Sequence, residues 1–109
     1  MIIVLAYVEG EIRFGGTGAD YSIPPKITFL ASEMTTLEEV KNEIYREFGY
    51  VGGQYTMSIQ ARFDTGAPEP HYFQLIPIHE KRGWRMIFEK TQSRTTWQVI
   101  ELYVNMAPS

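Results

Sequence analysis

Few side chains in this sequence could perform nucleophilic or metal chemistry. The chain has no cysteine and two histidines, His71 and His79. A catalytic nucleophile needs a neighbouring base and a third group that orients the base, and neither histidine lies in such a set. A strand of residues 72–78, rising about 3.3 Å per residue, would hold the two histidines too far apart to share one ion with Glu80. We therefore expect no catalytic residue, no metal site and no cofactor.

Two other patterns resemble reactive motifs. Residues 15–18 read Gly-Gly-Thr-Gly, but no Lys-Ser/Thr follows, and two prolines at 24 and 25 separate them from the next helix. This favours a flexible connection over a phosphate-binding loop. The adjacent carboxylates Glu38 and Glu39 lie where a helix is expected to begin, a position at which the helix dipole favours acids. Neither pattern requires a catalytic role.

Charge is distributed unevenly along the chain. Ten basic and thirteen acidic residues give a net charge of −3, but residues 33–47 hold five acids and two bases, whereas residues 79–94 hold two acids and five bases. Solvated helix faces explain such segments, and so does contact with an oppositely charged protein surface or with a second copy. The candidate interaction residues are the bases Arg13, Lys81, Arg82, Arg85 and Lys90 and the acids Glu38, Glu39 and Glu43. The same cations would also bind nucleic-acid phosphates weakly and without sequence preference.

Length and composition indicate one domain over residues 1–109. A chain of 109 residues with 44% hydrophobic residues has room for a single modest core. No apolar run approaches the ~20 residues of a membrane span. Because disulfides are rare inside cells, the absence of cysteine agrees with an intracellular protein. We expect no membrane and no small-molecule substrate among its partners.

The pattern of the first third of the chain predicts three strands. Residues 2–8 are apolar at almost every position, which is typical of a strand in the middle of a sheet with another layer packed on top of it. Residues 11–14 alternate, and we expect them to pair with residues 2–8 as a hairpin. Residues 15–20 are expected to be a flexible connection, and residues 26–31 either a short strand or a strand extension that leads toward the helix.

The clearest predicted element is a helix that begins at Thr36 and stops at Gly49. Thr36 and Glu39 have the spacing of a capping box, and a glycine favours a helix end. Apolar residues recur along one face at helical spacing (Leu37, Val40, Ile44 and Phe48). Further along, we expect a strand at 55–63, a protruding loop at 64–70, a strand at 72–78, a short helix at 83–90 and a last strand at 95–104.

This order of elements predicts an α+β domain. One amphipathic helix across a mixed sheet with the first strand in the centre is the β-grasp (ubiquitin-like) arrangement. We expect four to five strands, one main helix and a short second helix. A first strand that lies mid-sheet beneath the main helix would leave no hollow for a substrate, so the domain would act through its outer faces.

Several blocks of the sequence resemble the N-terminal domain of plant Mutator-like transposases and of the MUSTANG-type genes derived from them, a Phox/Bem-type β-grasp module. The blocks are residues 37–44 (Leu-Glu-Glu-Val-Lys-Asn-Glu-Ile) followed by Phe48-Gly49, residues 57–59 (Met-Ser-Ile), residues 75–78 (Leu-Ile-Pro-Ile) and residues 84–88 (Trp-Arg-Met-Ile-Phe). They occur in the same order over most of the chain. The resemblance implies a β-grasp fold, a nuclear location and an N-terminal module of a longer protein.

The resemblance also implies which chemistry to expect. Phox/Bem-type modules of the acidic class carry an Asp/Glu-rich segment between the fourth strand and the second helix, where this chain reads His-Glu-Lys-Arg-Gly at 79–83. The basic class carries a lysine on the first strand, which is absent from residues 1–8, and Arg13 is the nearest base. The transposase's catalytic carboxylates would lie outside these residues. We therefore expect a non-enzymatic interaction or oligomerisation module with a protein partner, and as the alternative an accessory nucleic-acid-binding domain.

Overall fold

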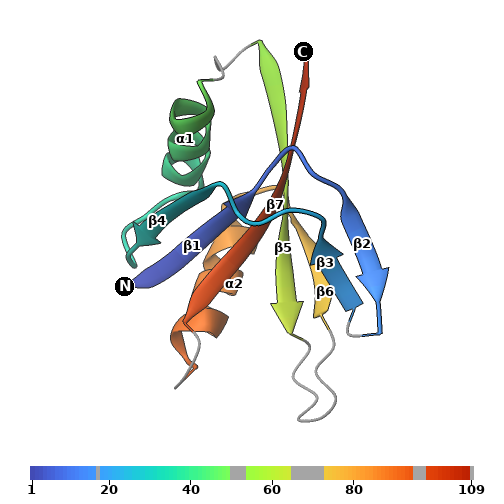
Figure 1. Ribbon diagram of the computed structural model, residues 1–109. Helices are drawn as coiled ribbons and strands as arrows, with labels where there is room; N and C mark the ends of the chain where they lie inside the picture. Colours follow the sequence, from blue (N-terminus) through green and yellow to red (C-terminus); the bar gives the residue numbers. More distant parts are fainter. Residues whose placement is uncertain (17, 50–53, 65–72, 95–97, 109) are drawn as a thin grey trace.

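A computed structural model describes residues 1–16, 18–49, 54–64, 73–94 and 98–108, which form one mixed sheet and two helices (Figure 1). Along the chain the elements are β1 (Ile2–Tyr7), β2 (Ile12–Gly15), β3 (Gly18–Tyr21), β4 (Ile27–Ala31), α1 (Leu37–Phe48), β5 (Tyr55–Asp64), β6 (Phe73–Ile78), α2 (Lys81–Gln92) and β7 (Val99–Pro108). The sheet order is β2-β3-β6-β5-β7-β1-β4. The expectation of an α+β domain with a mixed sheet is confirmed, but the sheet has seven strands in the described residues instead of four to five.

The first strand lies inside the sheet, as its apolar sequence predicts. β1 pairs with β7 in parallel and with β4 in antiparallel. Its residues Ile2, Val4 and Ala6 are buried beneath the helices. The other face is covered only in part, since Ile3 keeps 41% of its surface exposed. The expected place of this strand inside the sheet is therefore confirmed, with the helices on one face and the other face partly exposed.

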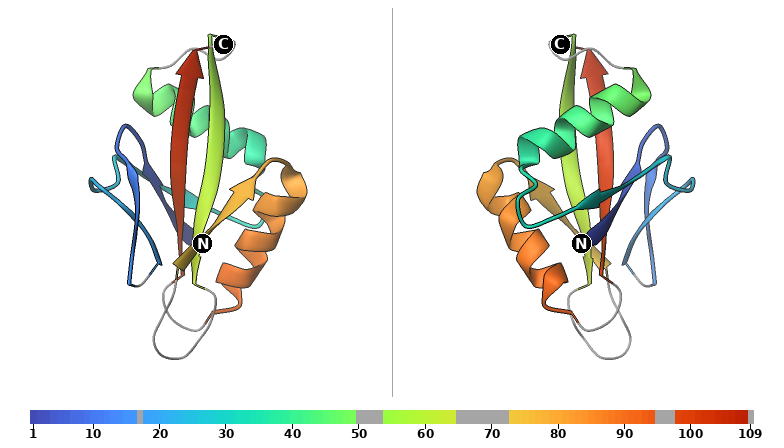
Figure 2. Two further views of the ribbon diagram at one scale, coloured as in Figure 1. Left: turned by 90° about the vertical axis from the view of Figure 1, so that its right-hand side faces the viewer. Right: turned by 90° about the vertical axis from the view of Figure 1, so that its left-hand side faces the viewer.

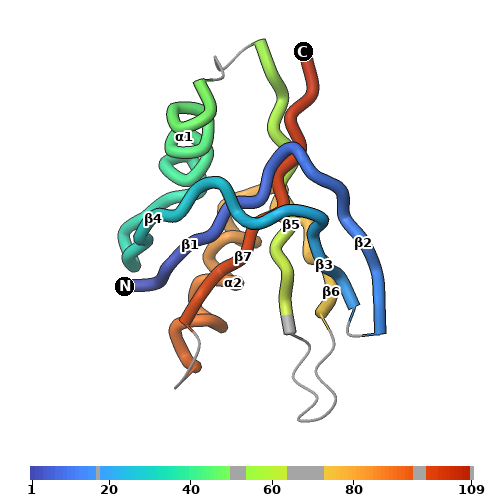
Figure 3. The backbone as a smooth tube through the Cα atoms, viewed as in Figure 1, coloured from blue at the N-terminus to red at the C-terminus, as the bar shows by residue number. Residues whose placement is uncertain are grey.

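The expected hairpin between residues 2–8 and 11–14 does not form. β1 pairs with β4 instead, and β2 pairs with β3. The chain turns away after β1 at Glu9, which has a φ of 67°, and the Gly10 amide then donates to the Tyr21 hydroxyl at 2.8 Å. Figure 3 traces the result: the chain runs down β2, back up β3 and then across to β4.

Part of the expected flexible connection at 15–20 is strand β3. Within it Ala19 is buried, and the neighbouring Tyr21 packs against Tyr7 and Tyr103 with ring centroids 5.5 and 4.9 Å away. Burial of this aromatic cluster holds the β2–β3 hairpin on the sheet. The glycine-rich sequence around Tyr21 gives no sign of this cluster, because one of its members, Tyr103, lies more than 80 positions away along the chain.

Both helices cover one face of the sheet, and the β2–β3 hairpin lies toward the other (Figure 2). Thr36 caps α1 by accepting a hydrogen bond from the Glu39 amide at 3.1 Å, and Gly49 ends it at a φ of 71°, as predicted. The core joins both helices to the sheet (Val40 and Ile44 of α1, Ile87 and Phe88 of α2, Ile100 and Leu102 of β7).

Other boundaries differ from those expected. α2 has 12 residues, so the second helix is as long as the first instead of short. β7 starts at Val99 and continues to Pro108, because residues 104–108 pair with the extended first half of β5. Asp64 belongs to β5, and residues 65–70 of the expected loop, with Tyr72 and residues 95–97, lie outside the described residues.

Gly18 gives a test of how the hairpin joins the sheet. It has a φ of +96°, and a Cβ at this position would lie 2.0 Å from the Phe73 carbonyl oxygen, on the strand with which β3 pairs. We expect Gly18→Ala to lower the free energy of unfolding by about 2 kcal/mol, because backbone strain adds to the clash. Urea unfolding would measure the loss as a lower midpoint at constant slope.

The matched control for this variant is Gly15→Ala. Gly15 lies on the other strand of the same hairpin, and a Cβ there would meet nothing within 4 Å. We expect this variant to keep wild-type stability. If the two alanine variants unfold at the same urea concentration, the close approach of β3 to β6 is not what requires glycine.

Candidate functional site

The starts of the two helices meet at one place, and Trp84 holds them together. Trp84 of α2 is 2% exposed and packs against Phe88. Its indole Nε1 donates to the Thr35 carbonyl at 3.0 Å, in the turn just before α1. Because this turn is itself closed by a hydrogen bond from the Ser32 amide to Thr35 Oγ1, the two helix starts are fixed relative to each other.

A cavity of about 330 Å³ opens between these helix starts. Its lining combines cations, hydroxyls and apolar surface (Lys81, Arg82, Arg85, Thr35, Thr36, Leu37 and Trp84). No acid contributes to the described lining, and we call this concavity the basic cavity. Three of the candidate residues proposed from the sequence, Lys81, Arg82 and Arg85, are thus brought together.

The cations of the basic cavity differ in how they are held. Arg85 donates from Nη2 to the Glu33 carbonyl at 2.7 Å, which fixes its guanidinium at the rim. Lys81 and Arg82 are exposed and form neither an ion pair nor a side-chain hydrogen bond within the described part of the chain. Two cations are therefore available for a partner.

The position of these two cations is unfavourable for α2 on its own. They occupy its first turn, which contains no acid, and the preceding Glu80 makes no side-chain cap. The N-terminus of a helix carries partial positive charge, so each cation there costs about 0.3–1 kcal/mol when exposed. An anionic group bound beside Lys81 and Arg82 would offset the repulsion between these cations and the positive end of the helix dipole.

The acidic candidates lie close to this place but are mostly occupied. Glu38 shares an adjoining concavity of about 400 Å³ with Lys41, Lys81 and Arg82. Glu39 accepts a hydrogen bond from the Thr36 hydroxyl, and Glu43 forms an ion pair with Arg46. The acidic and basic segments of the sequence therefore adjoin at the helix starts, where Glu38 and Glu80 line the adjoining concavity together with Lys81 and Arg82.

The remaining candidate bases are not part of the basic cavity. Arg13 lies on β2, with its Nη2 atom 3.9 Å from Asp20 and 3.4 Å from the Tyr21 carbonyl oxygen. Lys90 lies in the last turn of α2, at the opposite end of that helix from Arg82.

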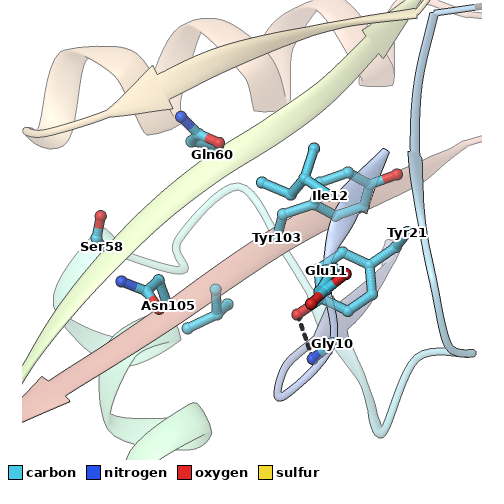
Figure 4. Close-up of a pocket in the computed structure, with 9 residues that line it drawn as sticks. Gly10, Glu11, Ile12, Tyr21, Ser58, Gln60, Tyr103 and Asn105 are labelled. Carbon is cyan, nitrogen blue, oxygen red and sulfur yellow. Dashed lines mark hydrogen bonds between the residues drawn. The ribbon is translucent and has the colours of Figure 1, made fainter. Parts of the chain in front are cut away.

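A second concavity, of about 530 Å³, lies on the outer face between β5, β7 and the hairpin (Figure 4). Ser58, Gln60 and Asn105 project into it from the two long strands, opposite Ile12 and the tyrosine rings. The expectation that the sheet leaves no hollow was therefore wrong. Apart from the phenols of Tyr21 and Tyr103, the ionisable group in its described lining is Glu11, so the groove is largely uncharged.

Beside this groove, a buried polar network joins β1, β5 and β7. Arg62 Nη1 lies 2.8 Å from Glu101 Oε2, with both side chains largely buried, and Arg62 Nε donates to the Ala19 carbonyl at 2.7 Å. The Tyr7 hydroxyl donates to the other Glu101 oxygen at 3.2 Å. Because Arg62 binds a carbonyl of β3, the network fixes the hairpin to the sheet.

Sequence reasoning missed two residues of the basic cavity and two residues of the polar network beside the groove. Leu37 and Trp84 were read only as core residues, although each also lines the basic cavity. Their positions in the sequence could have indicated this role, because Leu37 follows the helix cap Thr36 and Trp84 lies two positions after Arg82. Arg62 and Glu101 were not singled out, because each is a lone charge on a strand and their pairing depends on the β5–β7 register.

The described residues contain no cluster of three or more metal-ligating side chains. His71 lies outside them, so its expected separation from His79 is not described. No helix in the described ranges has the length and apolar character needed to cross a membrane. Comparison with protein families, curated proteins and solved structures finds no match to this chain.

The tyrosine network predicts a loss of stability in alkali. Burial, with a further contribution from the Glu101 carboxylate, raises the pKa of Tyr7 from 10.0 to about 12. Between these pH values the unfolded chain releases the Tyr7 proton while the folded chain keeps it, so the free energy of unfolding falls as pH rises. Burial raises the pKa of Tyr103 as well, which adds to the same trend.

We expect the free energy of unfolding of Tyr7→Phe to fall less steeply than that of the wild type between pH 10 and about 12, because this variant has no proton to lose at position 7. At neutral pH it should be about 1 kcal/mol less stable, through loss of one hydrogen bond. Urea unfolding at a series of pH values measures both effects. Parallel curves for the two proteins would contradict the proposed protonation of Tyr7 in the folded state.

Proposed function

We propose that this chain is a non-enzymatic protein–protein interaction module whose basic cavity binds an acidic segment of its partner. The observation that carries the proposal is the presence of two unpaired cations, Lys81 and Arg82, over a concavity without acids in its described lining. A carboxylate placed there would gain charge-assisted hydrogen bonds. Leu37 and Trp84 add apolar surface for a neighbouring aliphatic or aromatic side chain.

The fold supports an interaction role within the β-grasp class. Five strands in the order β4-β1-β7-β5-β6 place the first and last strands in parallel at the centre, with α1 connecting β4 to β5. This is the arrangement expected for a β-grasp domain, to which the β2–β3 hairpin would be an insertion between β1 and β4. We propose that assignment, and with it the relation to the N-terminal Phox/Bem-type domain of plant Mutator-like transposases and a nuclear setting.

The geometry favours an acidic partner over pairing with the α1 acids of another copy. Glu39 and Glu43 already have partners in their own chain, and Glu38 adjoins the cations that it would have to reach in the second copy. Head-to-tail contact needs two well-separated complementary faces. An acidic segment from a different protein does not depend on carboxylates that already have partners in their own chain, as Glu39 and Glu43 do.

The test uses an Asp/Glu-rich peptide as the probe and a random DNA duplex as its competitor. We expect the wild type to bind the peptide, and the double variant Lys81→Gln/Arg82→Gln to bind at least about tenfold more weakly, because each charge-assisted contact contributes about 1.5 kcal/mol or more. Fluorescence anisotropy at low and at physiological salt measures both affinities. Binding should weaken with salt, since the cations are exposed.

The matched control is Arg46→Gln/Lys90→Gln, which changes the net charge equally at positions outside the basic cavity. It should bind the peptide like the wild type. Equal losses in the two double variants would show attraction by net charge alone and contradict the proposal. Tighter binding of the duplex than of the peptide, lost in Lys81→Gln/Arg82→Gln, would assign the same cations to nucleic acid instead.

A further inference from the structure

Strand β4 forms one edge of the sheet. It pairs with β1 on one side, and no described strand pairs with its other side. The right-hand view of Figure 2 shows β4 crossing the molecule below α1. The backbone N–H and C=O groups along such an edge can accept a further strand.

The sequence of β4 lacks the features that protect sheet edges. Its five residues, Ile-Thr-Phe-Leu-Ala, include no charge, proline or glycine. The opposite edge strand, β2, has Arg13 in its centre and ends at Gly15. Since charged residues and short, interrupted strands discourage edge pairing, β4 is the edge suited to association.

Exposed apolar side chains lie directly beside this edge. On the outer face Leu30 is 58% exposed and stands opposite Ile3 of β1. Just beyond the strand, Met34 is 83% exposed and lines a concavity together with Met1. Exposed apolar side chains next to an open edge indicate a contact that is buried in an assembly.

We propose that β4 pairs in antiparallel with β4 of a second copy, about a two-fold axis through Phe29. In this register Thr28 of each copy lies opposite Leu30 of the other, so the two apolar outer faces join. Because β4 itself is uncharged, no like charges face each other along the ladder.

Charges at the two ends of β4 specify this direction of pairing. Lys26 precedes the strand and Glu33 follows it after Ser32. Antiparallel pairing brings the Lys26 end of each copy to the Glu33 end of the other, whereas a parallel arrangement would bring like charges together. Lys26 also binds Glu9 of its own chain at 2.7 Å, and that pair is about half exposed.

This inference does not rest on the proposed function. The basic cavity is lined from α1, α2 and the turn between β4 and α1, and none of its residues belongs to β4. A dimer through β4 would leave Lys81 and Arg82 free in both copies. Failure of either proposal therefore leaves the other standing.

The first experiment measures mass by sedimentation of the wild type and two lysine variants. We expect a monomer–dimer equilibrium that shifts with protein concentration over about 1–100 μM, because dimerisation follows mass action. Leu30→Lys should be monomeric, since it places a charge in the ladder of both copies. Phe14→Lys is the matched control, because Phe14 is an exposed apolar residue (71%) on the other edge strand, and it should dimerise like the wild type.

The second experiment determines the register, and it uses the absence of native cysteine. Thr28→Cys and Leu30→Cys are exposed single-thiol variants, and the proposed axis places position 28 of one copy opposite position 30 of the other. Cross-strand neighbours have Cβ atoms about 4.5–5.5 Å apart, within reach of oxidative cross-linking. An equimolar mixture should therefore form the mixed disulfide dimer severalfold faster than either variant alone forms its own.

Three results would overturn the inference. If the wild type stays monomeric at every protein concentration tested, β4 does not pair with a second copy, and an extended segment of another protein becomes the candidate occupant of this edge. Equal loss of dimer in Leu30→Lys and Phe14→Lys would place the interface elsewhere. Cross-linking of the mixture at no more than the rate of the separate variants would exclude the antiparallel register centred on Phe29. Circular dichroism of each variant ensures that a lost dimer is not a lost fold.

Discussion

Burial of one face of the first strand is the constraint on which the rest of this structure depends. Ile2, Val4 and Ala6 are almost fully buried, and they can be so only if β1 has a strand on each side and helices above it. The strand on one side is β7, from the far end of the chain, and their parallel pairing brings the two ends of the sequence together. Parallel neighbours require a crossover connection, and here nearly the whole chain serves as that connection. Both helices then lie on the face that β1 buries.

The route of the chain between β1 and β4 determines what the outer face can do. A short turn between β1 and β4 would supply no element to cover the outer face of the sheet. Instead the β2–β3 hairpin crosses to β6, where Gly18 allows close approach and Arg62 binds the Ala19 carbonyl. Tyr21 of the hairpin is buried with Tyr103 and packs against the partly buried Tyr7, and a largely uncharged groove remains beside them. The hairpin extends the sheet beyond β6 and makes β2 one edge strand. The other edge strand is β4, which carries no charge.

The starts of the two helices form a second candidate region, and it is charged, whereas the groove on the outer face is largely uncharged. Trp84 ties α2 to the turn before α1 by one buried hydrogen bond, and this fixes where the surrounding charges lie. Glu39 at the start of α1 takes part in capping, whereas the cations at the start of α2 oppose the dipole of their own helix. Such an arrangement costs some stability in the free domain, and an anionic partner would recover it. The interaction proposed for the cavity follows from that electrostatic imbalance.

Local structure could be predicted from the sequence alone. Helix α1, between its caps Thr36 and Gly49, follows from capping and 3.6-residue periodicity, and the buried place of β1 follows from its continuous apolar run. The sequence also grouped Lys81, Arg82 and Arg85, since these are close along the chain. Only the tertiary structure decided that β1 pairs with β4 instead of β2, that Arg62 meets Glu101, and that the acidic and basic segments adjoin. Each of these depends on which distant strands pair and in what register, and a single sequence encodes that choice only through the summed burial of the whole core.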